Sequence, residues 1–211
     1  MWIANYDKSR WFFYLEWVVL NAITVVAAGY AALALLSLIT GVFGDTIQVA
    51  GQTHITEDFL LFYVFCPMIG LFTGIIQYAL LRRYLQHMAW WIAATLLGWL
   101  LPFGVGFVFT ALIPRGPNPA IPWEVPGLML IGMTIALPQW WMLRKRVHHA
   151  AWWILANGIG LGMVGVLNHL STEPFAVVSA VVLMPAIATG IVCWRLVTLP
   201  KTEIGSGSPV L

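Results

Sequence analysis

Charged side chains are scarce in this sequence. Only 9% of the 211 residues are Asp, Glu, Lys or Arg, whereas 61% are hydrophobic. Soluble domains contain about 25% charged and about 45–50% apolar residues, so this balance argues against an ordinary soluble domain. It predicts that lipid surrounds much of the chain. The net charge of +2 comes from short, separate basic clusters, which form no continuous basic face for a nucleic acid.

Cysteines are few, and acidic residues are missing from the apolar parts of the chain. Cys66 and Cys193 should lie at different depths, too far apart for a disulfide, so we predict two free thiols. No apolar run contains a secure acidic residue, and the motifs Gly-x-Ser-x-Gly, His-Glu-x-x-His and Cys-x-x-Cys are absent. Because acid–base catalysis needs such groups, we predict that the protein is not an enzyme and holds no metal.

Long hydrophobic runs are what the sequence has in abundance. Six of them are long enough to cross a bilayer, which takes about 20 residues. They cover residues 18–41, 59–81, 89–113, 126–143, 151–170 and 175–194. The prediction is an all-α integral membrane protein with a six-helix transmembrane domain over residues 1–197 and a flexible cytoplasmic tail over 198–211. Residues 6–17 are either a segment lying in the membrane interface or the end of a tilted first helix.

The basic residues predict the orientation of these spans. With six spans, one side of the membrane receives nine of the 10 Lys and Arg residues, namely Lys8, Arg10, Arg82, Arg83, Arg144, Lys145, Arg146, Arg195 and Lys201. Arg115 alone falls on the other side. Lys and Arg are enriched in cytoplasmic loops, so both termini are predicted to be cytoplasmic.

One phrase occurs twice in the chain. The stretch Gln77–Gly98 returns as Gln139–Gly160, with Gln, Leu, Arg, His, Trp-Trp and Ile at matching positions. A small-xxx-small element precedes each glutamine, as Gly70-xxx-Gly74 and as Gly132-xxx-Ala136. A degenerate third copy, which we call the worn third copy, has Ala186-xxx-Gly190 followed by Cys193 at the position of the glutamine. The repeat predicts three helix hairpins of the same orientation, of which the third is degenerate.

Two interpretations of the repeated phrase remain open. In the first, it is structural: the small residues allow close helix packing, Gln77 and Gln139 bond between helices, and the basic residues and Trp pairs anchor the helix ends at the cytoplasmic headgroups. The Trp pairs are Trp90-Trp91 and Trp152-Trp153. In the second, Gln77 and Gln139 line a cytoplasm-facing pocket for a lipid head group, a pigment or a small solute.

His169 is the histidine at the end of a predicted span. It could serve as the axial ligand of a magnesium tetrapyrrole, with Asn168 nearby. The alternative is a turn residue that bonds Glu173 or water. A haem with two histidine ligands is not expected, because it needs two facing imidazoles at one depth.

A family resemblance rests on three short motifs, namely Gly74-xx-Gln77, Leu81-Arg82-Arg83 and Trp90-Trp91-Ile92. Over roughly residues 66–165 the chain resembles a group of small bacterial multi-pass membrane proteins with repeated Gln/Arg-Arg/Trp-Trp helix hairpins. The resemblance implies six helices and the bacterial inner membrane, and it implies no activity or ligand.

Three classes of function fit this sequence. The first is a non-catalytic protein that acts by association, as an accessory or structural subunit of a larger membrane complex, because it has 12 Trp, small-residue faces and no soluble domain. The second is a binder or carrier of a lipid, a carotenoid or a bacteriochlorophyll-type pigment; outside this alternative no cofactor is predicted. The third is a small-solute channel or transporter, but no intramembrane charge marks a path. The predicted partners are the lipid bilayer and other membrane subunits.

Overall fold

The computed structural model describes residues 2–49, 52–56, 64–85, 88–112, 124–147, 149–170 and 173–198. Within these ranges the chain forms six helices and two short strands. In chain order they are α1 (Trp2–Phe43), β1 (Thr46–Val49), β2 (Gln52–Ile55), α3 (Cys66–Leu81), α4 (Trp91–Leu112), α5 (Glu124–Leu143), α6 (Ala151–Leu170) and α7 (Pro174–Thr198). Each predicted apolar run therefore contains a helix. Residues 59–63 of the second run and 199–211 of the predicted tail lie outside the described residues.

Several helices have the length and surface of membrane-spanning elements. Three stretches are long and apolar enough to cross a membrane: Trp11–Phe43, Val125–Leu143 and Ala151–Leu170. Shorter apolar helices cover Cys66–Leu81, Trp91–Pro102 and Ser179–Arg195. Every helix also exposes large hydrophobic side chains, for example Phe12, Leu71, Leu97, Leu130, Ile159 and Ile191. These are the features of a helical membrane protein, as the sequence predicted.

Helix α1 is continuous over 42 residues, about 63 Å at 1.5 Å per residue. It includes residues 6–17, so their interpretation as a separate interface segment is wrong; no Gly or Pro interrupts this stretch, and the helix runs through it. The helix ends at Phe43, where Gly44 adopts a φ of 79° and donates its N–H to the Thr40 carbonyl at 2.8 Å. A left-handed glycine is a common helix stop, because it lacks the Cβ that makes this conformation costly.

The helical fold class is as predicted, but the connection after α1 is not purely a loop, because it contains a short hairpin. Strands β1 and β2 pair antiparallel, with Thr46 opposite Ile55 and Val49 opposite Gln52. Thr56 closes the base of the hairpin: its N–H donates to the Asp45 carbonyl at 2.9 Å and its hydroxyl to the Gly44 carbonyl at 2.8 Å. A hairpin this short gains little from the sheet itself, so these bonds back to the helix end hold it in place.

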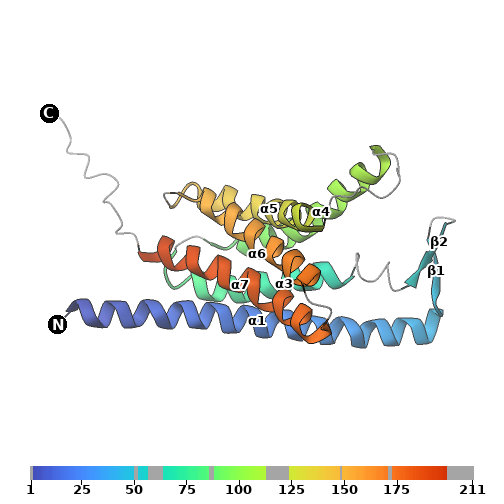
Figure 1. The fold of residues 1–211 in the computed structure, drawn as a ribbon, viewed down its shortest axis with the longest axis horizontal. Coiled ribbons are helices and arrows are strands. Elements are labelled where there is room, and N and C mark those ends of the chain that lie inside the picture. The colour runs from blue at the N-terminus through green and yellow to red at the C-terminus, as the bar shows by residue number, and fades with distance from the viewer. Residues whose placement is uncertain are drawn as a thin grey trace.

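The six helices form a closed ring. Each packs against the next in the order α1, α3, α4, α5, α6, α7, and α7 packs against α1 again. Helix α1 begins and α7 ends at the same end of the bundle, and the β1–β2 hairpin lies at the opposite end (Figure 1). The first and last helices of the chain are therefore neighbours, and the ring has no open seam.

Small residues lie at the helix crossings, as the repeated stripe predicted. A Cβ on Gly132 of α5 would overlap the Asn157 carbonyl of α6, and a Cβ on Gly98 of α4 would overlap the Ile135 carbonyl of α5. At the closure of the ring, a Cβ on Gly190 of α7 would lie 3.1 Å from Trp17 of α1. The first two approaches leave no room for a side chain, and the third is a tight contact with the Trp17 ring. Close van der Waals packing of this kind is a main source of helix adhesion in lipid.

Candidate functional site

The two glutamines of the repeat meet inside the ring. Gln139 Nε2 of α5 donates to Gln77 Oε1 of α3 at 3.3 Å. Both residues are buried, although α4 separates their helices in the ring order. The glutamine pair therefore connects two helices across the interior rather than along one helix crossing.

Each glutamine also accepts a hydrogen bond from a tryptophan. Trp91 Nε1 of α4 donates to Gln77 Oε1 at 3.2 Å, and Trp153 Nε1 of α6 donates to Gln139 Oε1 at 2.7 Å. In both cases the donor follows the acceptor by 14 residues. The repeated sequence thus produces a repeated indole–carboxamide bond, which joins α3 to α4 and α5 to α6.

A third version of this bond joins the two ends of the chain. Trp17 Nε1 of α1 donates to Thr189 Oγ1 of α7 at 3.2 Å. Thr189 lies four residues before Cys193, which occupies the glutamine position of the worn third copy. Since a thiol is a weak acceptor, the indole uses the hydroxyl one turn away. The third structural unit is therefore α7 with α1, not a pair of helices adjacent in sequence.

Each of the three tryptophans is followed four positions later by a side chain that bonds back to it. The Asn21 amide donates to the Trp17 carbonyl at 2.8 Å, the Thr95 hydroxyl to the Trp91 carbonyl at 2.9 Å, and the Asn157 amide to the Trp153 carbonyl at 2.9 Å. This arrangement recurs in α1, α4 and α6. It is independent support for placing α1 in the third repeat.

Two of these side chains continue the network between helices. Asn21 Oδ1 accepts from Gln77 Nε2 at 2.9 Å, and Thr95 Oγ1 accepts from Gln139 Nε2 at 2.8 Å. The bonds form one connected path through α1, α3, α4, α5 and α6. We call Asn21, Gln77, Trp91, Thr95, Gln139 and Trp153 the polar core.

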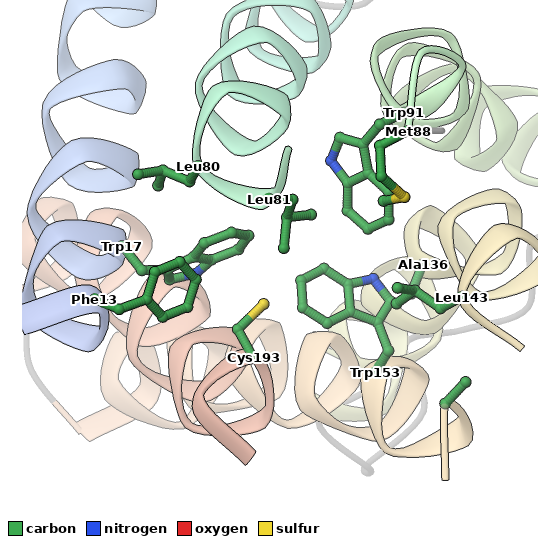
Figure 2. Packing of buried hydrophobic residues seen from close by; sticks show 11 residues of the cluster. Phe13, Trp17, Leu80, Leu81, Met88, Trp91, Ala136, Leu143, Trp153 and Cys193 are labelled. Atoms are coloured by element: carbon green, nitrogen blue, oxygen red, sulfur yellow. The ribbon is translucent and has the colours of Figure 1, made fainter. Parts of the chain in front are cut away.

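The three indoles lie together on the inner side of the helices. Trp17, Trp91 and Trp153 are each 0% exposed. The Trp153 ring packs edge-on against Trp91, with ring centroids 5.7 Å apart, and against Trp17 at 6.0 Å. Leu81 and Cys193 point into the same space (Figure 2). Edge-to-face packing of this kind adds to the stabilisation from burial.

The Trp pairs of the repeat therefore divide their roles. Trp90 and Trp152 are 75% and 56% exposed, which suits an interfacial anchor. Trp91 and Trp153 are fully buried, so the prediction that they too are interfacial anchors is wrong. Their neighbours on the helix face outward, and one residue along an α-helix turns the side chain by about 100°, which brings the second indole to the inside.

The polar core is neutral and internally bonded. Both glutamine amides donate and accept within the protein. Among the described residues, only Trp194 Nε1 is a fully enclosed side-chain polar atom without a hydrogen-bond partner. An enclosed polar group without a partner costs about 1–3 kcal/mol, so the network removes a large penalty at its centre. The two cysteines are free thiols, as predicted, with Cys193 buried and Cys66 partly so.

The other predicted binding residues lie elsewhere. Asn168 and His169 are exposed in the last turn of α6, whereas Trp153 lies in its first turn; the rise between them is about 24 Å. The structure therefore brings Gln77 and Gln139 together and leaves His169 and Asn168 out of that site. Within the described part of the chain, no three His, Cys, Asp or Glu side chains gather as a metal site would require. The ligand role of these four residues stays a prediction.

Sequence reasoning missed Trp17 and Thr189 as partners in the third unit. A usable signal was present, because Trp-xxx-Asn occurs at Trp17–Asn21 and at Trp153–Asn157, with Trp-xxx-Thr at Trp91–Thr95. This pattern is shared by α1, α4 and α6, so it extends the repeat to the first helix. Thr189 carries no such signal, since its position in the third copy is not that of the glutamine.

Comparisons of the chain with protein-family models, with characterised proteins and with solved structures find no match.

The buried and exposed members of one Trp pair provide a matched test of the polar core. We expect Trp91→Phe to lower the free energy of unfolding by about 1–3 kcal/mol, because it removes the indole donor to Gln77 and leaves space in a packed core. Trp90→Phe, one residue away and exposed, should change it by less than about 0.5 kcal/mol. Unfolding of both variants in mixed detergent micelles measures the difference, and equal effects would show that the buried indole has no special role.

Proposed function

We propose that this protein crosses the bacterial inner membrane six times, with both termini in the cytoplasm. We further propose that it acts without catalysis, as an accessory subunit that associates with other membrane proteins through α1. The observation that carries the proposal is the outer half of α1, which the rest of the protein leaves largely uncovered.

The distribution of charge supports the proposed orientation. Arg82 and Arg83 follow α3, and Arg144, Lys145 and Arg146 follow α5; all five are exposed. Their excess of positive charge is typical of a cytoplasmic face. Asp45 is exposed and directly precedes β1, and the β1–β2 hairpin lies at the other end of the bundle (Figure 1).

The packing of α1 supports association through this helix. Its buried residues, Phe13, Trp17, Asn21, Thr24 and Ala28, all precede residue 29. Residues 29–43 are described throughout and contain no buried side chain. Within this range the segment Gly29–Leu36, "GYAALALL", is rich in small residues, and Gly29 has nothing within 4 Å of a built Cβ. Small residues on an uncovered transmembrane face expose little area to lipid but allow a second helix to approach closely.

The interior of the bundle supports association over ligand carriage. The amides of Gln77 and Gln139 bond to each other and to the protein's own indoles, Asn21 and Thr95. A ligand held by these glutamines would have to replace bonds that are already made. A partner that packs on the outside of α1 requires no such exchange.

Two exposed positions at opposite ends of the bundle test the orientation. In a chain that carries Cys66→Ala and Cys193→Ala, we expect Asp45→Cys to react with a membrane-impermeant maleimide in intact bacterial spheroplasts. Lys145→Cys should react only after the membrane is permeabilised, because the α5–α6 turn faces the cytoplasm. Labelling of Lys145→Cys from outside would show that the proposed orientation is reversed.

Two glycines of α1 test the association surface. Gly29→Leu and Gly41→Leu add the same side chain, and neither position has protein atoms within 4 Å of a built Cβ. Gly29 lies inside the small-residue segment that ends at Leu36, whereas Gly41 lies beyond it, about 18 Å further along the helix. After purification in mild detergent, the unaltered protein and Gly41→Leu should retain stoichiometric co-purifying membrane polypeptides, and Gly29→Leu should lose them.

The same purification separates the alternatives. A protein that elutes alone in all three forms, without partner polypeptides, would contradict the accessory-subunit proposal. A stoichiometric lipid or an absorbance in the visible range, lost on His169→Ala or Gln139→Leu, would favour the carrier of a hydrophobic ligand.

A further inference from the structure

The two turns of the repeat, after α3 and after α5, are not equivalent on the surface. Arg82 and Arg144 occupy the same position of the repeat, and so do Arg83 and Lys145. Two of the other differences change the chemistry of the surface: Trp141 stands where the first copy has Ala79, and Arg146 where it has Tyr84. The second turn therefore has an additional indole and an additional basic side chain, whereas the first turn keeps a tyrosine. The repeat thus provides its own comparison between two versions of one structural element.

Helix α1 contacts the first turn and pairs with one of its two arginines. Arg83 Nη1 lies 2.8 Å from Glu16 Oε1 of α1, and the Tyr84 ring packs edge-on against Phe13 of α1, with centroids 4.9 Å apart. The Arg82 guanidinium lies 5.9 Å from the Tyr78 ring centroid, a looser contact. The first turn therefore contacts α1, and the charge of Arg83 is paired with the Glu16 carboxylate of the same chain.

The second turn presents its basic side chains outward. The Arg144 guanidinium carbon lies 3.3 Å from the centroid of the exposed Trp141 ring and 5.2 Å from that of Trp140. Lys145 is exposed beside it. In the described part of the chain, no carboxylate forms an ion pair with Arg144 or Lys145. Arg146 donates to the Met142 carbonyl at 3.3 Å and so closes the end of α5.

This geometry suits a phosphate group. A guanidinium that rests on an indole face is held in one orientation by cation–π attraction and keeps its in-plane N–H groups available to oxygen acceptors. Charge-assisted bonds from arginine to phosphate are strong and can be bidentate. The exposed indoles of Trp141 and Trp152 are side chains that prefer the level of the lipid headgroups, which is where such a phosphate would lie.

We propose that the α5–α6 turn binds the headgroup of an anionic phospholipid, through Arg144 and Lys145 with Trp141 as the platform. The α3–α4 turn, where Arg83 pairs with Glu16 of α1 and Ala79 stands in place of Trp141, does not. The inference rests on the membrane placement proposed above, and it adds a lipid class and a site to it. It predicts a preference for phosphatidylglycerol over phosphatidylcholine at one turn of an otherwise repeated structure.

Native mass spectrometry of the protein in mild detergent, titrated with phosphatidylglycerol, measures the binding directly. We expect Arg144→Gln and Lys145→Gln each to raise the apparent Kd about fivefold, since each basic side chain near the surface contributes about 1 kcal/mol to anionic lipid binding. Trp141→Ala keeps both charges and should raise it about two- to fivefold, because the guanidinium loses its platform. Arg82→Gln, the matched control in the first turn, should leave the Kd unchanged.

Parallel titrations with phosphatidylcholine and with inorganic phosphate identify the source of the phosphate. The proposal is supported if the protein binds phosphatidylglycerol but binds neither phosphatidylcholine nor inorganic phosphate. Displacement of the lipid by inorganic phosphate would show that the site binds a free anion. Equal effects of Arg82→Gln and Arg144→Gln on the Kd would show that lipid binding is general attraction by positive charge. Either result overturns the proposal. Flotation of the unaltered protein with phosphatidylcholine vesicles is the control for membrane placement. A protein that does not float would contradict the proposed function itself.

Discussion

The structure depends on hydrogen bonds between indoles and side-chain acceptors in the interior of the helix ring. Trp91 and Trp153 bond to Gln77 and Gln139, and Trp17 bonds to Thr189. In lipid there is no hydrophobic driving force between helices, so van der Waals packing and hydrogen bonds hold them together. An apolar helix face can pack against several alternative neighbours, whereas a buried polar group needs a specific partner, because leaving it unbonded is costly. Pairing these groups therefore specifies which helices are neighbours.

This constraint also explains why the chain closes on itself. The third indole belongs to the first helix and its acceptor to the last, so α1 completes a unit that α7 begins. Helix α1 then serves two purposes along its length. Its first half packs as a member of the ring and contacts the α3–α4 turn through Glu16 and Phe13. Its second half is left uncovered, and we propose that a partner binds there. The basic side chains of the α5–α6 turn are exposed.

The sequence predicted the elements better than their partners. Apolar length placed all six helices, and the duplicated phrase correctly singled out Gln77 and Gln139 as bonding residues of adjacent repeats. Which indole each glutamine meets could not be derived, because a repeat identifies equivalent positions and not their neighbours. Trp91 and Trp153 were misplaced at the interface since a Trp pair at a helix start fits an anchor equally well by composition. The β1–β2 hairpin and the α7–α1 unit depend on contacts that no single span reveals.

A double-mutant cycle on Gln139 and Trp153 tests the central claim most directly. Each single change, Gln139→Leu or Trp153→Phe, leaves one buried partner of the 2.7 Å bond unbonded, whereas the double variant removes both. The free energy of unfolding should therefore fall less in the double variant than the sum of the two single effects, by about 1 kcal/mol. Strictly additive losses would show that the indole–carboxamide bond does not hold the ring together.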